Sequence, residues 1–248
     1  MLQQTTALYP PKAVLMIRRH SAITRLTHWV NAFCLAILLM SGLQIFNAHP
    51  ALYWGDISTF EHPLAIIRRF PGWATIPSYQ DLAGGRLWHF FFAWVLVING
   101  ALYLLASLAS RHLARDLVPS RAQLRHIGQA IREHLRLRFP EGEEARRYNV
   151  LQQLSYLAVI FILVPLIVLT GLCMSPQLNA DFPWLPAMFG GRQSARTLHF
   201  IAASGLTLFV LVHVAMVILS GFWNNMRSMI IGRYAIRLGD GHAQSPQH

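Results

Sequence analysis

The sequence predicts an all-α integral membrane protein, a four-transmembrane-helix bundle with an in-plane amphipathic helix on its cytoplasmic side. Three observations support this fold class. Hydrophobic residues make up 54% of the 248 residues and charged residues only 12%, and the mean hydropathy is +0.38, which is more apolar than a soluble domain of this length. Four long stretches contain no Asp, Glu, Lys or Arg. The basic residues between these stretches gather on one side of the implied membrane.

Each charge-free stretch is long enough to cross a bilayer, which takes roughly 20 apolar residues. The first span follows a basic head, as in a secretory signal, but it is too long for the apolar region of such a signal and no small-residue cleavage site closes it. We therefore expect it to be retained as an anchor. The expected single membrane domain is 1–248, with spans at about 23–47, 87–110, 150–174 and 196–223, an outer loop at 48–85 and a cytoplasmic loop at 111–148.

The net charge of +11 raises the question of nucleic-acid binding, and the distribution of the charge argues against it. In the four-span topology, sixteen basic and six acidic residues lie on the side of both termini, and five basic and four acidic residues lie on the other side. Basic residues are enriched on the cytoplasmic side of membrane proteins. We expect both termini in the cytoplasm and no nucleic-acid partner.

The two long loops differ in character. The outer loop is rich in Pro, Trp and Tyr and is too long for a minimal helix connection, so we expect a cap or docking surface, or, for individual Trp residues, a belt at the lipid interface. In the cytoplasmic loop, arginines surround apolar residues that recur at helical spacing, which predicts a basic in-plane helix. Anionic lipid headgroups are its expected partner and a cytoplasmic protein is the alternative. The apolar positions are Leu124, Ile127, Ile131 and Leu135.

The third span contains Pro165 and no histidine. We expect this helix to pack against the others, with a bend at the proline. No chemistry is assigned to it.

Four of the twelve histidines lie inside the charge-free spans. His28 lies in the first span, His89 in the second, and His199 and His213 in the fourth. Ionisable groups at such depth are costly and usually functional. One such histidine alone would be explained as well by packing, with its ring bonded to a backbone carbonyl, but four with a shared geometry favour a functional site.

The fourth span sets that geometry. His199 and His213 are fourteen residues apart, which in a helix means a rise of about 21 Å and a net rotation of about 40°. They share a helix face at opposite depths, so a single zinc site with four histidines is excluded and two separate sites are required. From the direction in which each helix enters the membrane, His28 should face His213 and His89 should face His199.

Two facing imidazoles at each site, with no carboxylate in any span, favour a six-coordinate haem iron with two histidine ligands. A proton relay inside a membrane normally includes Asp or Glu, so it fits less well. Neither Cys34 nor Cys173 lies in a C-x-x-C-H motif, so covalently attached haem is not expected. The predicted cofactors are two b-type haems, with the four histidines as axial iron ligands.

Two glycines and several arginines fit the same sites. Gly42 lies fourteen residues after His28, at the depth of the outer site, and Gly100 lies eleven residues after His89, at the depth of the inner site. Each would leave clearance for a flat porphyrin, although small residues also serve ordinary helix packing in membranes. Arginines near the span ends suit the anionic haem propionates, or serve topology alone. These are Arg25 for the inner haem and Arg86, Arg192 or Arg196 for the outer one.

With these residues in view, the chain resembles the prokaryotic cytochrome b-561-like family, the bacterial di-haem b-type cytochromes that are membrane subunits of formate dehydrogenase, nickel-iron hydrogenase and thiosulfate reductase. The resemblance covers most of the chain and implies the same histidine pairing. It also implies a location in the bacterial inner membrane, a quinone pocket beside the inner haem and a periplasmic catalytic subunit, of molybdenum or nickel-iron type, near the outer haem. The motifs that carry it are Arg25-Leu26-Thr27-His28-Trp29, Ser41-Gly42, Leu87-Trp88-His89, and Thr197-Leu198-His199 with His213.

Asn31, Trp223 and Asn224 are candidates to line the quinone pocket, and interfacial anchoring explains them equally well. The expected function is transmembrane electron transfer through two haems between the quinone pool and a periplasmic redox partner, with no catalytic residue assigned. One alternative is a self-sufficient quinone-linked oxidoreductase acting on superoxide or a small reductant. Another is a histidine-based metal or solute carrier without haem. Assembly as a homo-oligomer is also compatible with the sequence.

Overall fold

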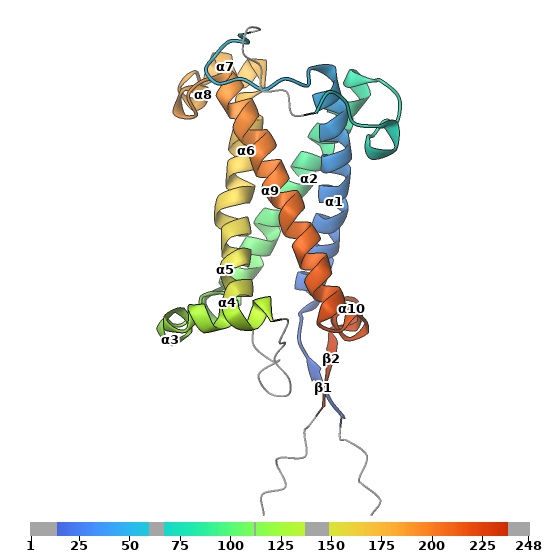
Figure 1. Cartoon of the computed structure of the whole chain (residues 1–248), viewed down its shortest axis with the longest axis vertical. Helices are drawn as coiled ribbons and strands as arrows, with labels where there is room; N and C mark the ends of the chain where they lie inside the picture. The colour runs from blue at the N-terminus through green and yellow to red at the C-terminus, as the bar shows by residue number, and fades with distance from the viewer. Residues whose placement is uncertain (1–13, 60–66, 112, 137–148, 238–248) are drawn as a thin grey trace, which may run out of the picture.

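A computed structural model describes residues 14–59, 67–111, 113–136 and 149–237 of the chain. Its long elements are four membrane-length helices that form one bundle (Figure 1). Each is long and apolar enough to cross a bilayer, which confirms the predicted four-helix membrane fold. The four spans are α1 (Ala22–Ala48), α2 (Leu82–Ala109), the continuous run Val150–Cys173, and α9 (Arg192–Leu219).

The helices begin where side chains cap their free backbone N–H groups. The hydroxyl of Ser21 accepts a hydrogen bond from the Thr24 amide at the start of α1, and the Asp81 carboxylate accepts one from the Gly84 amide at the start of α2. Asn149 and Gln152 form a reciprocal capping box at the start of the third span. The second helix therefore begins at Leu82, before the charge-free stretch on which the prediction was based, because Asp81 and Arg86 belong to its capped first turns.

The third span is not a uniform α-helix. It consists of α5 (Val150–Ala158), a π-helical turn η4 (Val159–Leu163) and α6 (Val164–Cys173), which carries Pro165 in its first turn. A proline has no N–H to donate to the preceding turn, and a wider turn directly before it accommodates that loss. The irregularity expected at the proline is therefore a π-turn just before it.

The fourth span ends earlier than predicted. α9 stops at Leu219, Gly221 has a φ of +108°, and α10 (Phe222–Ile231) then runs across the end of the bundle. The helix therefore ends four residues before the expected residue 223, because glycine readily adopts the left-handed conformation that ends a helix. Trp223 and Asn224 consequently lie on α10.

A two-stranded antiparallel sheet extends from this same end of the bundle (Figure 1). Strand β1 (Val14–Arg18) pairs with β2 (Arg233–Arg237), with Val14 opposite Arg237 and Arg18 opposite Arg233. We call this end of the bundle the sheet end. The opposite end is called the loop end. It holds the described residues between α1 and α2 and the short helices α7 (Pro176–Asp181) and α8 (Trp184–Met188).

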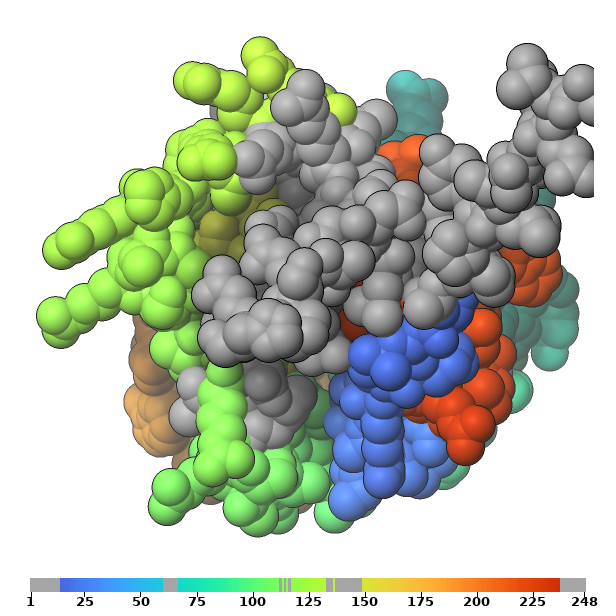
Figure 2. All heavy atoms as spheres, turned by 90° about the horizontal axis from the view of Figure 1, so that it is seen from below, coloured from blue at the N-terminus to red at the C-terminus, as the bar shows by residue number. Residues whose placement is uncertain are grey.

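The predicted in-plane helix is present at the sheet end. After a π-turn, η2 (Leu113–Leu117), the chain forms α3 (Arg121–Arg125) and α4 (Ile127–Leu135), which lie across the bundle (Figure 1). Seen from the sheet end, these helices occupy one side of the molecule and β1 with α10 the other (Figure 2). The exposed arginines on this segment are Arg121, Arg125, Arg132 and Arg136.

The core contains small side chains, whereas large apolar side chains face outward. Ser41, Thr170, Cys173 and Ala195 are fully buried. Many large apolar residues of the long helices are exposed, for example Trp94, of which 62% is exposed. This distribution is typical of helices that approach one another closely and present bulky residues to lipid. The main helix pairings are α1 with α2 and α6 with α9.

Candidate functional site

The structure brings the four intramembrane histidines together in two pairs. Near the loop end, the ring centroids of His89 on α2 and His199 on α9 are 6.2 Å apart, with an interplanar angle of 61°. Near the sheet end, the centroids of His28 on α1 and His213 on α9 are 6.3 Å apart, at 54°. These are the two pairings that the helix directions predict, and each pair joins α9 to another helix.

The spacing within each pair fits one bound metal atom. Two imidazoles that bind one iron from opposite sides have ring centres about 6 Å apart, since each metal–nitrogen bond is about 2 Å long and each nitrogen lies about 1 Å from its ring centre. Across the described residues, three or more His, Cys, Asp or Glu side chains nowhere cluster to hold a metal ion. Two-histidine ligation of an iron already held by a porphyrin therefore suits these pairs best.

The loop-end histidines each contact a buried hydroxyl on a neighbouring helix. His89 Nδ1 lies 3.0 Å from Ser41 Oγ on α1, and His199 Nδ1 lies 3.2 Å from Thr170 Oγ1 on α6. Both hydroxyl groups are themselves donors within their helices, from Ser41 to the Ile37 carbonyl and from Thr170 to the Leu166 carbonyl. The Nδ1 atoms are therefore held within the protein, which leaves both Nε2 atoms available as ligands.

A glycine follows each of these hydroxyl residues and lies close to the same histidine ring. A Cβ added at Gly42 would lie 3.4 Å from His89 Cε1, and one added at Gly171 would lie 3.3 Å from His199 Cε1. The structure thus shows Gly42 making room for the edge of a histidine. A Cβ at Gly100 would meet no described protein atom within 4 Å. The predicted role of Gly42 and Gly100 in porphyrin clearance stays a prediction.

The sheet-end pair has mainly aromatic neighbours. Phe209 stacks on His213 with a centroid distance of 5.8 Å and an angle of 18°, and Tyr156 meets the same ring edge to face at 6.5 Å. Trp29 meets His28 edge to face at 5.4 Å. His28 Nδ1 is buried, and among the described residues it has no hydrogen-bond partner. The two pairs therefore differ in their surroundings: one is bordered by hydroxyl groups and the other by aromatic rings.

The arginines proposed for propionates make contacts of their own. Arg25 donates from Nη1 to the Ile230 carbonyl of α10 at 2.6 Å, and Arg86 is exposed with its guanidinium over the Phe90 ring at 5.5 Å. Arg192 donates to the Met174 carbonyl at 3.1 Å. Their predicted role toward propionates remains a prediction, as does that of Arg196, which is described next.

Residues 49–56 lie against the first turns of α9, just before His199, and are hydrogen-bonded to them. We call this segment the 49–56 clamp. Arg196 donates to the carbonyls of His49 and Ala51. Thr197 donates to the Tyr53 carbonyl at 2.6 Å, and the Ser194 hydroxyl accepts from the Gly55 amide at 2.8 Å. His199 follows directly on α9, so the clamp fixes the start of the helix that carries it.

The candidate quinone residues make protein contacts as well. The Asn31 side-chain oxygen accepts a hydrogen bond from Asn99, which also donates to the Thr27 carbonyl. Asn224 bonds the backbone of Ala235 on β2 through both its amide nitrogen and its oxygen. Trp223 is 81% exposed on α10. Their role at a quinone site stays a prediction.

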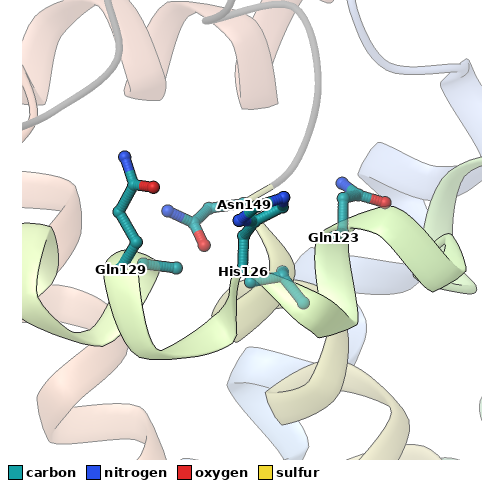
Figure 3. A pocket seen from close by; sticks show the side chains of 6 residues that line it. Gln123, His126, Gln129 and Asn149 are labelled. Carbon is teal, nitrogen blue, oxygen red and sulfur yellow. The ribbon is translucent and has the colours of Figure 1, made fainter.

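A separate pocket of about 260 Å³ lies at the sheet end, between α3–α4 and the start of α5 (Figure 3). Its lining combines polar and apolar side chains, and neither histidine pair contributes to it. It is therefore not part of the candidate haem sites. The lining residues are Gln123, His126, Gln129, Ala130, Asn149 and Val150.

Sequence reasoning missed the contribution of the third span. Thr170 and Gly171 hold the His199 ring as Ser41 and Gly42 hold His89. A signal was present, because Thr170-Gly171-Leu172 repeats the pattern of Ser41-Gly42-Leu43 at the corresponding depth of another span. Because the third span carries no histidine, the sequence alone does not connect this pattern to a ligand site.

Comparisons with known proteins agree with this geometry. The profile of the family described as prokaryotic cytochrome b561 matches residues 19–232. The chain is 34% identical over 200 residues to the "Putative protein-methionine-sulfoxide reductase subunit YedZ1" of Azospira oryzae, an alignment that covers 81% of this chain and 90% of that protein. It is 24% identical over 227 residues to the "Probable Ni/Fe-hydrogenase B-type cytochrome subunit" of Cupriavidus necator, covering 88% of this chain and 82% of that protein.

Proposed function

This chain belongs to the prokaryotic cytochrome b561 family of membrane electron-transfer subunits, and from that premise we propose that it carries electrons across a bacterial inner membrane through two b-type haems. His89 and His199 would hold the haem near the loop end, and His28 and His213 the haem near the sheet end. The quinone pool would exchange electrons at the sheet end and a periplasmic redox subunit at the loop end.

One observation carries this proposal: α9 presents two histidines at opposite ends of the bundle, each with its ring centre 6.2–6.3 Å from that of a histidine on an earlier helix. Two such pairs would place two haems at different depths of the membrane, so that an electron could cross it by way of both. A b-type haem bound between two histidines supplies a one-electron couple between ferric and ferrous iron. The helices hold the ligand rings, and the apolar side chains around them keep water and competing reactions away.

The distribution of basic residues indicates how the bundle is oriented in the membrane. The segments at the sheet end carry most of the basic residues, including the exposed arginines of α3 and α4, and such segments are typical of the cytoplasmic side. We therefore assign the sheet end to the cytoplasm and the loop end to the periplasm.

Both relatives are named as subunits of larger enzymes, one of a methionine-sulfoxide reductase and the other of a nickel-iron hydrogenase. These names support a catalytic partner for this chain too. We propose that the partner docks at the loop end, near the His89–His199 pair, and that the direction of electron flow depends on which partner it is.

The test is a dithionite-reduced minus oxidised spectrum of the purified protein, with haem quantified per chain as the pyridine haemochrome. We expect two haems per chain. His199→Ala should remove mainly the loop-end haem and His213→Ala mainly the sheet-end haem, so that each variant retains about half of the wild-type content. Exposed His126 on the α3–α4 segment provides the control, since His126→Ala should retain both haems. A colourless wild-type protein, or one with a single haem, would overturn the proposal.

A further inference from the structure

We propose that Ser41 and Thr170 are positioning residues that hold His89 and His199 in the Nδ1–H tautomer, orient both rings toward a shared iron, and lower the reduction potential of the loop-end haem. This inference rests on the proposed function, because it assigns the two hydroxyl groups to the same haem site. It extends the site from the helices that carry its ligands, α2 and α9, to the two helices that pack beside them, α1 and α6.

The direction of the hydrogen bonds defines the tautomer. A hydroxyl group has one proton to donate. Ser41 directs its proton to the Ile37 carbonyl at 2.7 Å, so toward His89 Nδ1, at 3.0 Å, it acts as an acceptor. Thr170 directs its proton to the Leu166 carbonyl at 2.6 Å and accepts from His199 at 3.2 Å. Each ring then carries its proton on Nδ1 and a lone pair on Nε2.

At both histidines, the hydroxyl residue and the glycine that follows it contact the same ring. Ser41 and Thr170 are both 0% exposed, and each is followed by a glycine whose added Cβ would come within 3.3–3.4 Å of Cε1 of the same histidine. Contact at that distance is tight, so a larger residue would push the ring away from the hydroxyl. Two pairs of helices, α1–α2 and α6–α9, thus repeat one arrangement, with a hydroxyl–glycine pair on the first helix and a histidine on the second.

The sheet-end pair provides a comparison within the same protein. Among the described residues, His28 Nδ1 has no hydrogen-bond partner, and His213 is bordered by Phe209 and Tyr156. The hydroxyl contacts are therefore specific to the loop-end pair. A hydrogen bond from Nδ1–H makes the imidazole a stronger donor through Nε2 and favours the more positive, ferric iron, which lowers the reduction potential.

The experiment is a spectroelectrochemical titration of the full-length protein in detergent, comparing wild type with Ser41→Ala and Thr170→Val. We expect each variant to shift the loop-end haem to a higher potential and to leave the sheet-end haem unchanged. Outer-shell contacts of this kind are typically worth about 10- to 100-fold in metal affinity, so the loop-end haem should also dissociate more readily. The electron paramagnetic resonance signal of the oxidised loop-end haem should change with the potential, whereas a merely structural role for the hydroxyls would move neither.

Matched controls are available. Thr207 and Ser204 also donate to carbonyls within their own helix, to Ala203 and Phe200 of α9, so Thr207→Val and Ser204→Ala should leave both potentials unchanged. Ser41→Thr and Thr170→Ser retain a hydroxyl and should restore the wild-type potential. Because Ser41 and Thr170 lie on different helices and serve different histidines, either variant alone suffices if the other fails to insert.

The outcomes separate the two proposals. Two haems in the wild type, with the loop-end potential and resonance signal unaltered in both variants, would overturn the positioning role and leave the proposed function intact. Absence of haem from the wild type would overturn the proposed function itself.

Discussion

At the scale of single residues, Gly100 offers a direct test of where a porphyrin lies. An alanine Cβ at this position would meet no described protein atom within 4 Å, and in a helix Ala is favoured over Gly by up to about 1 kcal/mol. In the protein by itself, Gly100→Ala should therefore be harmless or stabilising.

With a porphyrin occupying the space beside Gly100, the added methyl group should interfere with it. We expect Gly100→Ala to lower the content of the sheet-end haem selectively, as measured by the pyridine haemochrome and by loss of one component from the redox titration. Gly128→Ala, on the surface helix α4, also meets open space and serves as the control. Full occupancy of both haems in Gly100→Ala would show that the porphyrin lies elsewhere.

The sequence predicts the histidine pairs better than it predicts the hydrogen-bond partners of the polar residues around them. The four histidines and their pairing could be derived from spacing and helix direction alone, because a helix has a fixed rise and rotation per residue. The partners of Arg196 and Asn31 could not, since guanidinium and amide groups bond equally well to a cofactor, a loop carbonyl or another side chain. Only the folded chain shows that Arg196 reaches His49 and Ala51, and Asn31 reaches Asn99.

At the scale of elements, α1 and α2 are joined by a buried polar contact as well as by packing. Asn99 is 8% exposed and donates to the Thr27 carbonyl at 2.8 Å and to Asn31 at 2.7 Å. Polar contacts between membrane helices are modest, averaging about 0.6 kcal/mol and reaching about 2 kcal/mol. We expect the same range here.

A double-mutant cycle measures this coupling. Asn31→Leu and Asn99→Leu should each lower the free energy of unfolding in mixed micelles by about 1 kcal/mol, and the double variant should lose less than the sum, because the two residues share one hydrogen bond. Strict additivity of the two losses would show that Asn99 acts through Thr27 alone.

The 49–56 clamp yields a second prediction for an element. Gly191, directly before α9, has a φ of +107°, and a Cβ added there would collide with Asp56 Oδ1 and the Gly55 carbonyl. Left-handed backbone costs a residue other than glycine on the order of 1–3 kcal/mol. We expect Gly191→Ala to release the clamp from α9.

Release should appear as faster hydrogen exchange at the Gln193 and Ser194 amides, which both donate to the Gly55 carbonyl. Gly205→Ala on α9 makes only ordinary contact with Leu163, at 3.6 Å, and should leave this exchange unchanged. Unaltered protection of the two amides in Gly191→Ala would mean that the clamp does not depend on this turn.

Element boundaries show where sequence patterns stop being informative. The apolar run past Leu219 predicts a continuous helix, but one glycine at Gly221 ends α9 and redirects the chain into α10. The β1–β2 pairing was not predicted, since its strands lie more than 200 residues apart and each is only five residues long. Hydropathy reports on burial in lipid and carries little information about short elements in the aqueous phase.

At the scale of the whole molecule, both histidine pairs depend on α9. The helix places His199 near the loop end and His213 near the sheet end, while α1 and α2 each bring one histidine to it. The two pairs therefore lie toward opposite membrane surfaces. Under the proposed function, the orientation in which the bundle is inserted decides which pair would meet quinone and which a periplasmic partner.

The charge distribution predicts that orientation. About ten net positive charges lie on the side of both termini and about one on the other, and the excess of Lys and Arg stays in the cytoplasm during insertion. A green fluorescent protein fused after His248 should therefore fluoresce, and alkaline phosphatase fused at the same point should be inactive. A cysteine introduced at Ser58, beyond the 49–56 clamp, should react with an impermeant maleimide added to intact spheroplasts, whereas one at exposed Arg125 on α3 should react only after lysis. The opposite labelling pattern would place the His89–His199 pair on the cytoplasmic side and exclude a periplasmic partner for it.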